Sequence, residues 1–463
     1  MTLSAAIVLA AGEGTRMKSN IPKVLHTFAG KTFLRRVMDS VTALEPDRLA
    51  VVVHFQGERV AAAARSYDPE VRIVDQDDIP GTGRAVQCAM KALDADAGGD
   101  GLSGAVLIAA SDMPLLDSQT LRSLLDYHER SGDVCTVLTT MLDDPTGYGR
   151  IIRDSAGDVL GIVEQKDATS NELAVHEVNT SVYVFDAKVL EAAIAGLDSN
   201  NAQGEFYLTD ALKAAKRGGK VGAFAAPDPL SVEGVNDRVQ LAHLAKAHNV
   251  RVCERWMREG VTILDPDTTW IEDDVEIDRD ATILPGCFLQ GHTVIGEGAV
   301  VGPYTTLIDA AVDAGATVER SRIQETHIGE RATIGPWTYL RPGNDLGEGA
   351  KAGAFVEMKK AHIGAGTKVP HLSYVGDADL GERTNIGGGT ITANYDGVHK
   401  HHTTIGSGVH VGAGNLFVAP VTVGDNVTTG AGSVVRHDVP DDAMVYSENT
   451  QHIVENWKPA WER

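Results

Sequence analysis

The second half of the chain carries a six-residue repeat of apolar side chains, which limits the possible folds more than any other feature. Three runs stay in register: Ile277, Ile283, Leu289, Ile295, Val301 and Leu307; Ile334, Leu340, Leu346, Ala352 and Met358; Ile405, Val411, Phe417 and Val423, followed by Thr429 and Val435. A period of six indicates a short strand followed by a tight turn, with the apolar residue pointing inward. Three such hexads predict one triangular coil of about 18 residues, and successive coils stack about 4.8 Å apart, as strands in a sheet do.

Glycine usage supports this interpretation and divides the chain. Of the 49 glycines, 28 fall in residues 260–463 and 21 in residues 1–259. Glycine relieves the strained turn positions that such a coil requires. We therefore expect two architectures in the 463 residues, a length that also predicts more than one hydrophobic core.

Charge and composition exclude several classes of protein. Lys and Arg number 41 against 64 Asp and Glu, and the formal net charge of −23 argues against a sequence-independent nucleic-acid binder but not against small anionic substrates. No apolar run approaches the roughly 20 residues of a membrane span. The four cysteines show no CxxC spacing, and Ala5–Ala11 is typical of a buried first strand rather than a signal peptide. These features predict a cytoplasmic protein with reduced thiols.

The first half alternates short apolar runs with segments of helical spacing. Runs of strand length lie at Ala5–Leu9, Leu49–Val53, Val71–Val74, Ala105–Ala109 and Val134–Met141, and helical spacing is found at Phe33–Leu44 and Thr120–Arg130. This alternation predicts an α/β domain with a mostly parallel sheet, helices on both faces, and ligands at the carboxyl ends of the strands. Residues 239–259 predict a linker helix between a domain at 1–238 and a coil domain at 260–463.

A glycine-rich loop follows the first strand, where a phosphate-binding loop would lie. Residues 12–17 read GEGTRM, but Met17 stands where both the dinucleotide fingerprint GxGxxG and the P-loop GxxxxGKS require glycine. A plain glycine turn therefore remains an alternative. The two glycines allow backbone amides to approach a ligand, and Arg16 and Lys23 add positive charge nearby, a combination that favours a triphosphate over a nicotinamide cofactor.

A series of motifs follows in order along this half of the chain. They are LAAGEGTRM at 9–17, IPKVL at 21–25, Gln76, GTG at 81–83, SD at 111–112, GYGRI at 147–151, GIVEQKD at 161–167, NT at 179–180 and EGVN at 233–236. Together they resemble the signature of sugar-1-phosphate nucleotidyltransferases, which have a Rossmann-like domain. The resemblance implies attack by a sugar-phosphate oxygen on the α-phosphorus of a nucleoside triphosphate, a reaction that depends on positioning and charge neutralisation.

Two features of the repeat region are not required by a purely structural solenoid. The register breaks at 392–404, where Asn394, Tyr395 and the run Lys400-His401-His402 predict a polar loop that projects from the coil. His371 stands beside Pro370 at a turn, although a turn histidine with a satisfied hydrogen bond remains an alternative for it.

Further motifs surround these residues: RPG at 341–343, FVEMKK at 355–360, HLSY at 371–374, NIG at 385–387 and GTITANYDG at 389–397. With them the chain, from about Ser4 to about Asp442, resembles the bacterial bifunctional N-acetylglucosamine-1-phosphate uridyltransferase/glucosamine-1-phosphate N-acetyltransferase family. The resemblance implies a left-handed parallel β-helix, against the usual right-handed rule for crossovers. It also implies a homotrimer that acetylates glucosamine-1-phosphate with acetyl-CoA and then transfers UMP from UTP to N-acetylglucosamine-1-phosphate.

The resemblance implies a role for each matched residue. The set expected to bind UTP and UDP-N-acetylglucosamine is Leu9, Ala10, Ala11, Gly12, Arg16, Lys23, Gln76, Gly81, Thr82, Ala110, Ser111, Asp112, Gly149, Glu164, Asn179 and Asn236. Asp112 and Asn236 would hold Mg²⁺, which prefers oxygen ligands, although Asp112 alone is equally typical of a cap or turn. His371 would act as general base. The acetyltransferase substrate would contact Arg341, Lys359, Tyr374 and Asn385, and acetyl-CoA would contact Gly388, Asn394, Tyr395, Ala413 and Ala431.

The sequence departs from the family pattern at four of these places. Ala110 stands where Tyr is common, Ser181 where Gly is common, Ala413 where Ser is common, and Glu448 near a position often occupied by Arg. Two alternatives to the bifunctional enzyme remain. One is a single-activity nucleotidyltransferase with a structural, trimerising β-helix, and the other is a trimeric scaffold that binds UDP-sugars without turnover.

Overall fold

The computed structural model describes residues 2–97, 101–448 and 450–462. The chain forms two compact units, Met1–Lys246 and Ala247–Arg463, and helix α8 (Arg238–Arg258) continues across their boundary. Across the described ranges, no helix combines the length and the apolar character needed to cross a membrane.

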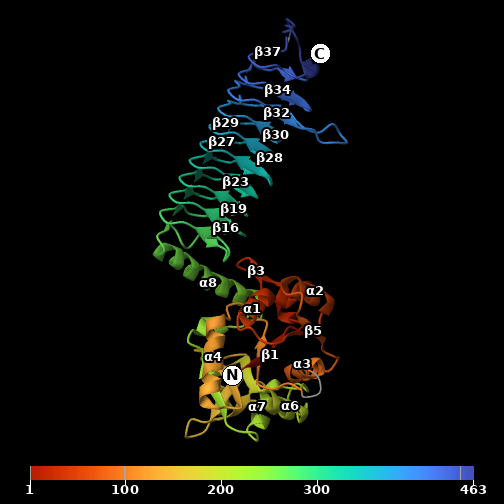
Figure 1. Ribbon diagram of the computed structural model, residues 1–463, viewed down its shortest axis with the longest axis vertical. Coiled ribbons are helices and arrows are strands. Elements are labelled where there is room, and N and C mark those ends of the chain that lie inside the picture. The colour runs from red at the N-terminus through yellow and green to blue at the C-terminus, as the bar shows by residue number, and fades with distance from the viewer. Residues whose placement is uncertain (1, 98–100, 449, 463) are drawn as a thin grey trace. The chain divides into compact units, whose positions relative to one another are not determined.

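The N-terminal unit is built on a nine-stranded sheet (Figure 1). Its central order is β11 (Val221–Ala225), β7 (Cys135–Met141), β10 (Glu177–Asp186), β6 (Ala105–Ala110), β1 (Leu3–Leu9), β4 (Leu49–Val53) and β5 (Arg72–Asp75), with β8 (Arg150–Arg153) and β9 (Val159–Val163) paired beside β10. Strand β1 pairs in parallel with β4 and β6, whereas β10 runs antiparallel to β6 and β7. The expected mostly parallel sheet is confirmed, and each expected strand lies within two residues of an observed one.

Helices cover both faces of this sheet, because alternate residues of its central strands are apolar in both directions. Ala5 and Ile7 of β1 pack into one core with α3 (Thr82–Ala97), α6 (Ala187–Ala195) and α7 (Leu208–Ala215). Ala6 and Val8 pack into the other core with α1 (Phe33–Thr42), α2 (Gly57–Tyr67) and α4 (Ser118–Ser131). The smaller elements are β2 (Thr27–Phe28), β3 (Lys31–Thr32), α5 (Ser170–Leu173) and short 3₁₀ turns at Thr15–Met17, Lys23–Leu25, Pro229–Val232 and Ala460–Glu462.

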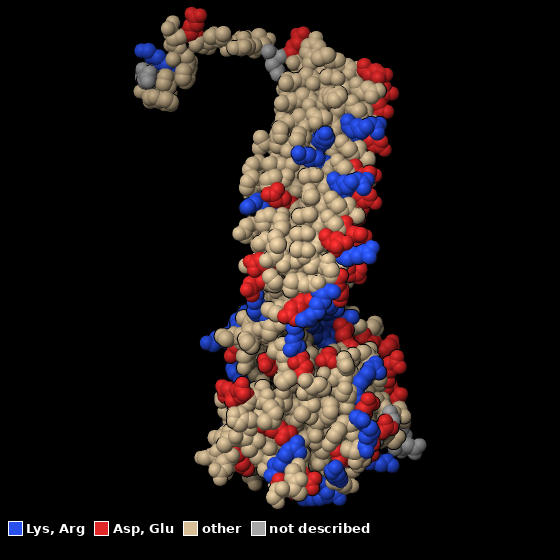
Figure 2. Space-filling model, turned by 90° about the vertical axis from the view of Figure 1, so that its left-hand side faces the viewer, with Lys and Arg blue, Asp and Glu red and all other residues tan. Residues whose placement is uncertain are grey.

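The C-terminal unit is a parallel β-helix, as the six-residue repeat predicts. Its strands are β12 (Thr262–Ile263), β13 (Trp270–Ile271), β14 (Glu276–Ile277), β15 (Thr282–Ile283), β16 (Phe288–Gln290), β17 (Val294–Ile295), β18 (Val300–Val301), β19 (Thr306–Ile308), β20 (Ala311–Val312), β21 (Thr317–Val318), β22 (Arg322–Gln324), β23 (Thr326–Ile328), β24 (Thr333–Ile334), β25 (Tyr339–Leu340), β26 (Asn344–Leu346), β27 (Lys351–Ala354), β28 (Glu357–Ile363), β29 (Lys368–His371), β30 (Tyr374–Leu380), β31 (Ile391–Ala393), β32 (Thr403–Ile405), β33 (Leu416–Val418), β34 (Val421–Val423), β35 (Thr428–Thr429), β36 (Val434–Val435) and β37 (Met444–Val445). Figure 2 shows charged side chains gathered along one edge of this unit, with fewer of them on the rest of the visible face.

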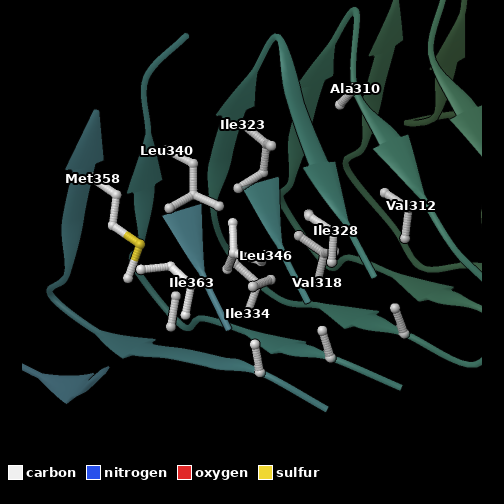
Figure 3. Packing of buried hydrophobic residues seen from close by; sticks show 14 of the residues in the cluster. Ala310, Val312, Val318, Ile323, Ile328, Ile334, Leu340, Leu346, Met358 and Ile363 are labelled. Carbon is white, nitrogen blue, oxygen red and sulfur yellow. The ribbon is translucent and has the colours of Figure 1, made fainter. Parts of the chain in front are cut away.

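The repeat positions form the core of the β-helix. Every one of them is buried, with at most 5% of its surface exposed. Figure 3 shows Leu340, Leu346, Met358 and Ile363 directed into the interior of the coil, where residues of neighbouring coils meet. Burial of each such aliphatic side chain contributes roughly 1.5–3 kcal/mol, so the repeat is a large contribution to the stability of this unit.

The register gives the length of each coil. Ile277 pairs with Ile295, 18 positions later, which matches three hexads per coil. In the stretch between the first and second runs the coils are shorter, since Val312 pairs with Ile328, only 16 positions later. The coil therefore continues through a region where the six-residue period is lost. The expected projecting loop occupies 394–402 between β31 and β32 and stands out from the coil in Figure 1.

Candidate active sites

A cleft of about 610 Å³ opens at the carboxyl ends of β1, β5 and β6 in the N-terminal unit. Twelve residues expected to bind UTP line it: Leu9, Ala11, Gly12, Lys23, Gln76, Gly81, Thr82, Ala110, Ser111, Asp112, Glu164 and Asn179. Of the other four, Asn236 and Gly149 hydrogen-bond lining residues, Arg16 hydrogen-bonds Asn236, and Ala10 is buried directly after β1. The cleft also contains His54, Ser181 and Tyr183, which were not among the expected residues.

The glycine-rich loop packs Lys23 against the start of the cleft. Gly14 adopts a φ of +65°, and a Cβ there would lie 2.5 Å from the Cβ of Lys23, so only glycine fits. A Cβ at Gly12 would meet no atom within 4 Å, which leaves open space beside the backbone of the loop. This arrangement brings a fixed ammonium and exposed backbone close together, as binding of a phosphate group requires.

Two cations and two oxygen ligands meet at one edge of the cleft. The Lys23 Nζ lies 2.6 Å from Asp112 Oδ2 and 3.2 Å from Asn236 Oδ1, and Arg16 Nη2 donates to the same amide oxygen over 2.8 Å. The backbone holds the two oxygen ligands together, because the Val235 N–H donates to the Asp112 carbonyl over 2.8 Å. In the described parts of the chain, no group of three or more His, Cys, Asp or Glu has the arrangement of a metal site.

This pair of oxygens fits a divalent cation. The ammonium of Lys23 already bridges Asp112 and Asn236, so a positive charge is accommodated between them. A hard cation such as Mg²⁺ commonly takes only one or two protein oxygens and completes its shell with water and substrate phosphates. The donor set is therefore sufficient for a metal that is shared with a nucleotide.

One end of the cleft combines Gly149, Glu164 and Asn179. The Asn179 N–H donates to the Gly149 carbonyl over 2.9 Å, and a Cβ at Gly149 would lie 3.4 Å from both carboxylate oxygens of Glu164. Burial raises the pKa of Glu164, although a hydrogen bond from Thr209 at 3.3 Å opposes the shift. A half-buried carboxylate with free acceptor capacity suits the hydroxyl groups of a sugar.

Another part of the cleft wall is formed by the segment from Gln76 to Thr82, and the Thr82 hydroxyl accepts a hydrogen bond from the Leu208 N–H over 3.2 Å. The Gln76 amide donates to the carbonyls of Ile79 and Gly81, at 2.8 and 3.3 Å, which fixes its orientation. Gly81 has a φ of +120°, and a Cβ there would lie 2.3 Å from the Phe206 carbonyl oxygen. Close backbone approach therefore requires glycine at this position.

In the β-helix, His371 and Gly388 lie against each other on successive coils. His371 is the exposed last residue of β29, and its backbone carbonyl accepts a hydrogen bond from the Ser373 hydroxyl at 3.0 Å. A Cβ at Gly388 would lie 2.6 Å from His371 Cδ2 and 2.7 Å from Nε2. Glycine at 388 thus provides the space that the imidazole occupies, and the ring remains open to solvent.

The residues expected to bind acetyl-CoA continue this corner of the coil. The Gly414 N–H donates to the Gly388 carbonyl and the Gly432 N–H to the Ala413 carbonyl, both over 2.8 Å. The turns that contain Gly388, Ala413 and Ala431 therefore stack one above another. Ala413 and Ala431 are both exposed, so a ligand can approach this stack of small residues.

Three cations gather on the adjoining face, and one of them was missed from sequence. The pKa of Lys359 is lowered, first by its contact with the ammonium of Lys400 and also by the charge of Arg341. Arg341 Nη1 itself contacts Glu357 Oε1 at 3.1 Å. Lys400 belongs to the projecting loop. The polar composition of that loop was the only sequence signal for a functional role, and the sequence does not show that Lys400 lies next to Lys359 of β28. Such a cluster of like charges favours an anionic ligand.

The projecting loop is tied to the coil by Asn394. Its amide donates to the Asp377 carboxylate and lies 3.5 Å from the Tyr374 hydroxyl. Tyr395 is largely exposed and donates its hydroxyl hydrogen to the Gly397 carbonyl over 2.6 Å. Asn385 is exposed and forms an isolated bridge with Lys368, at the start of the segment that leads to Gly388.

Comparisons with known proteins agree with both units. Residues 6–170 match the MobA-like NTP transferase domain family, and residues 402–437 match the bacterial transferase hexapeptide family (six repeats), consistent with a left-handed β-helix. The bifunctional protein GlmU of Bifidobacterium longum (strain NCC 2705) is 80% identical over 463 residues, which is all of both chains. That of Bifidobacterium adolescentis (strain ATCC 15703 / DSM 20083 / NCTC 11814 / E194a) is 82% identical over the same length, and that of Paenarthrobacter aurescens (strain TC1) is 51% identical over 99% of this chain and 92% of the relative.

Proposed function

Because the chain belongs to the GlmU family of bifunctional proteins, we propose that each of its two units carries one of two successive reactions, with the residues described above in defined roles. The protein is a bifunctional enzyme with acetyltransferase and uridyltransferase activities. It acetylates glucosamine-1-phosphate with acetyl-CoA and transfers UMP from UTP to the N-acetylglucosamine-1-phosphate so formed, releasing pyrophosphate. The observation that supports two separate sites best is that each cluster lies entirely within a unit that has its own hydrophobic core.

In the cleft, the residues position two anions for nucleotidyl transfer. A phosphate oxygen of the acceptor attacks the α-phosphorus of UTP, and the bond to the pyrophosphate breaks. Arg16 and Lys23 neutralise the phosphates, while Glu164 and Asn179 bind the sugar and Gln76 binds the uracil. The family generally requires a divalent metal, for which we propose Mg²⁺ held by Asp112 and Asn236; when bound, it supplies further neutralisation of phosphate charge.

On the β-helix, the residues deprotonate an amine and hold a phosphate. The imidazole of His371 accepts a proton from the glucosamine nitrogen as that nitrogen attacks the thioester carbonyl. The C–S bond then breaks, and the proton passes from the imidazolium to the leaving sulfur, so that coenzyme A leaves as a thiol. Arg341, Lys359 and Lys400 form the anion site for the sugar phosphate. The stacked turns at Gly388, Ala413 and Ala431 give acetyl-CoA a path along the corner of the coil next to His371.

We further propose that the enzyme is a homotrimer assembled through the β-helix. An exposed aromatic corner supports an interface, since the rings of Trp337 and Phe355 stack with centroids 5.3 Å apart while both residues remain more than half exposed. Contiguous exposed apolar surface of this kind usually marks a contact with another chain. We propose a cytoplasmic location, where UTP and acetyl-CoA are available.

One pair of assays tests these roles. Thiol release from acetyl-CoA with glucosamine-1-phosphate reports the first reaction, and pyrophosphate release from UTP with N-acetylglucosamine-1-phosphate and Mg²⁺ reports the second. We expect His371→Ala to abolish only thiol release and Asp112→Ala to abolish only pyrophosphate release. Loss of both activities in either variant, with folding intact by circular dichroism, would contradict the two-site assignment. A wild-type enzyme that releases pyrophosphate but no thiol would favour the structural β-helix instead.

A further inference from the structure

The two positions at which the cleft departs from the family pattern lie opposite each other. Val182 of β10 pairs with Ala109 of β6 in antiparallel register, which places Ser181 opposite Ala110. Ala110 in turn pairs with Leu9 of β1. Leu9, Ala110 and Ser181 all line the cleft, so a strip of the wall crosses three neighbouring strands. Ala110 offers only a methyl group, and the one polar side chain of this strip is the Ser181 hydroxyl.

The backbone of Ser181 is in a conformation that disfavours serine. Its φ is +62°, in the left-handed region, and it lies where the pairing of β10 with β7 is irregular. A residue with a Cβ is less stable than glycine in this conformation by roughly 1–2 kcal/mol. Glycine would therefore give the backbone a lower free energy at this position. A strained residue in a ligand cleft points to a role for its side chain.

The contacts of Ser181 place it beside the residues proposed to bind the sugar. Its backbone N–H donates to Asn179 Oδ1 over 2.9 Å, which ties it to the end of the cleft formed by Asn179, Glu164 and Gly149. The side-chain hydrogen bonds of Arg16 and Lys23 go to Asp112 and Asn236, and among the described residues none joins either cation to Asn179, Ser181 or Glu164. In the described parts of the chain, the Ser181 hydroxyl forms no hydrogen bond with protein, so its donor and acceptor capacity is free for a ligand.

We propose that Ser181 is a specificity-determining residue whose hydroxyl hydrogen-bonds the sugar ring of the acceptor sugar phosphate, in the space that the small side chain of Ala110 leaves open. This inference rests on the proposed function of the cleft. It predicts that the hydroxyl contributes to binding of the sugar phosphate and not to binding of UTP.

The test is the steady-state kinetics of pyrophosphate release by full-length variants. The substrates N-acetylglucosamine-1-phosphate and UTP are varied separately, with Mg²⁺ in excess. We expect Ser181→Ala to raise the KM for the sugar phosphate about three- to tenfold, the effect of one neutral hydrogen bond, with kcat and the KM for UTP within twofold of wild type. Ser123→Ala is the matched control, because this partly exposed serine lies outside the cleft lining and donates only to the Gln119 carbonyl of its own helix.

Ser181→Gly separates the hydroxyl from the backbone. It relieves the left-handed strain, so we expect a melting temperature at or above that of wild type together with the same rise in KM. Wild-type KM values in Ser181→Ala, an equal rise in both KM values, or recovery of the wild-type KM in Ser181→Gly would each overturn the inference alone. A wild-type enzyme that releases no pyrophosphate from these substrates would overturn the proposed function and the inference with it.

Discussion

Substitution of Gly388 by alanine tests whether the position of the His371 imidazole controls acetyl transfer. The added Cβ would lie 2.6 Å from His371 Cδ2 and 2.7 Å from Nε2, whereas ordinary contacts begin at 3.4 Å. The ring must therefore move by at least 0.8 Å, the difference between 3.4 and 2.6 Å. No left-handed φ is present at Gly388, so the perturbation is steric and the backbone is not strained.

The expected magnitude follows from the displacement. A misplacement of about 1 Å at a reacting group costs on the order of 10²-fold in rate, which corresponds to about 2.7 kcal/mol. Because His371 is exposed, its ring can move without disturbing the apolar core of the coil, and we expect the free energy of unfolding to fall by less than about 1 kcal/mol.

Thiol release measures the effect, and pyrophosphate release by the same preparation is the internal control. We expect kcat for acetyl transfer to fall about 10²-fold, with uridyl transfer unchanged. A rise in the KM for acetyl-CoA with unchanged kcat would instead mean that Gly388 acts only through coenzyme A. Acetyl transfer within threefold of wild type in a folded Gly388→Ala variant would refute the reasoning.

Three other changes separate the contributions of charge, burial and packing. Lys400→Ala should raise the KM for glucosamine-1-phosphate about tenfold or more, as loss of a charged hydrogen bond does. It should also raise the pKa of Lys359, because the neighbouring ammonium is gone. Thiol-release kinetics measure the KM, and the pH dependence of that KM reports the pKa. Glu164→Gln should abolish sugar binding yet raise the melting temperature more at pH 7 than at pH 4. Burial raises the folded-state pKa of Glu164, so stability falls as the pH rises from the unfolded value of about 4.3 through the folded one, and the glutamine lacks this loss. Phe417→Ala should destabilise the C-terminal coils by about 3–5 kcal/mol, so that heating abolishes thiol release before pyrophosphate release and hydrogen exchange rises near β33.

The β-helix was predictable where its period is regular and not elsewhere. A strict spacing of six places Ile277, Ile283 and Leu289 on three faces of one coil, and the observed pairings match it. Between 308 and 333 the coils shorten to 16 or 17 residues, and a search for a constant period fails although the inward positions remain apolar. Backbone pairing between coils needs only that each turn returns the chain to the same face, so turn length can vary without loss of the fold.

The cleft was predictable through its motifs, whereas contacts between distant segments were not. Asp112 and Asn236 are 124 residues apart, and nothing in their spacing indicates that Lys23 bridges their oxygens. Lys400 is similar, because its contact with Lys359 depends on how the projecting loop folds back on the coil. Ser181 carried a signal as a departure from pattern, but its meaning depends on the strand register that places it opposite Ala110.

The two sites show how a chain of net charge −23 can be arranged to bind anions. In the cleft, the Lys23 ammonium is paired with Asp112 before any ligand arrives, so its charge costs little in the free protein. On the coil, Lys359 and Lys400 lie close together, and their mutual repulsion lowers the pKa of Lys359. An anion that binds between them relieves this repulsion as well as forming its own contacts. Net charge therefore affects the solubility of the chain, while the choice of ligand depends on a few cations. Lys23 is paired with a carboxylate of the protein, whereas Lys359 and Lys400 repel each other until an anionic substrate binds.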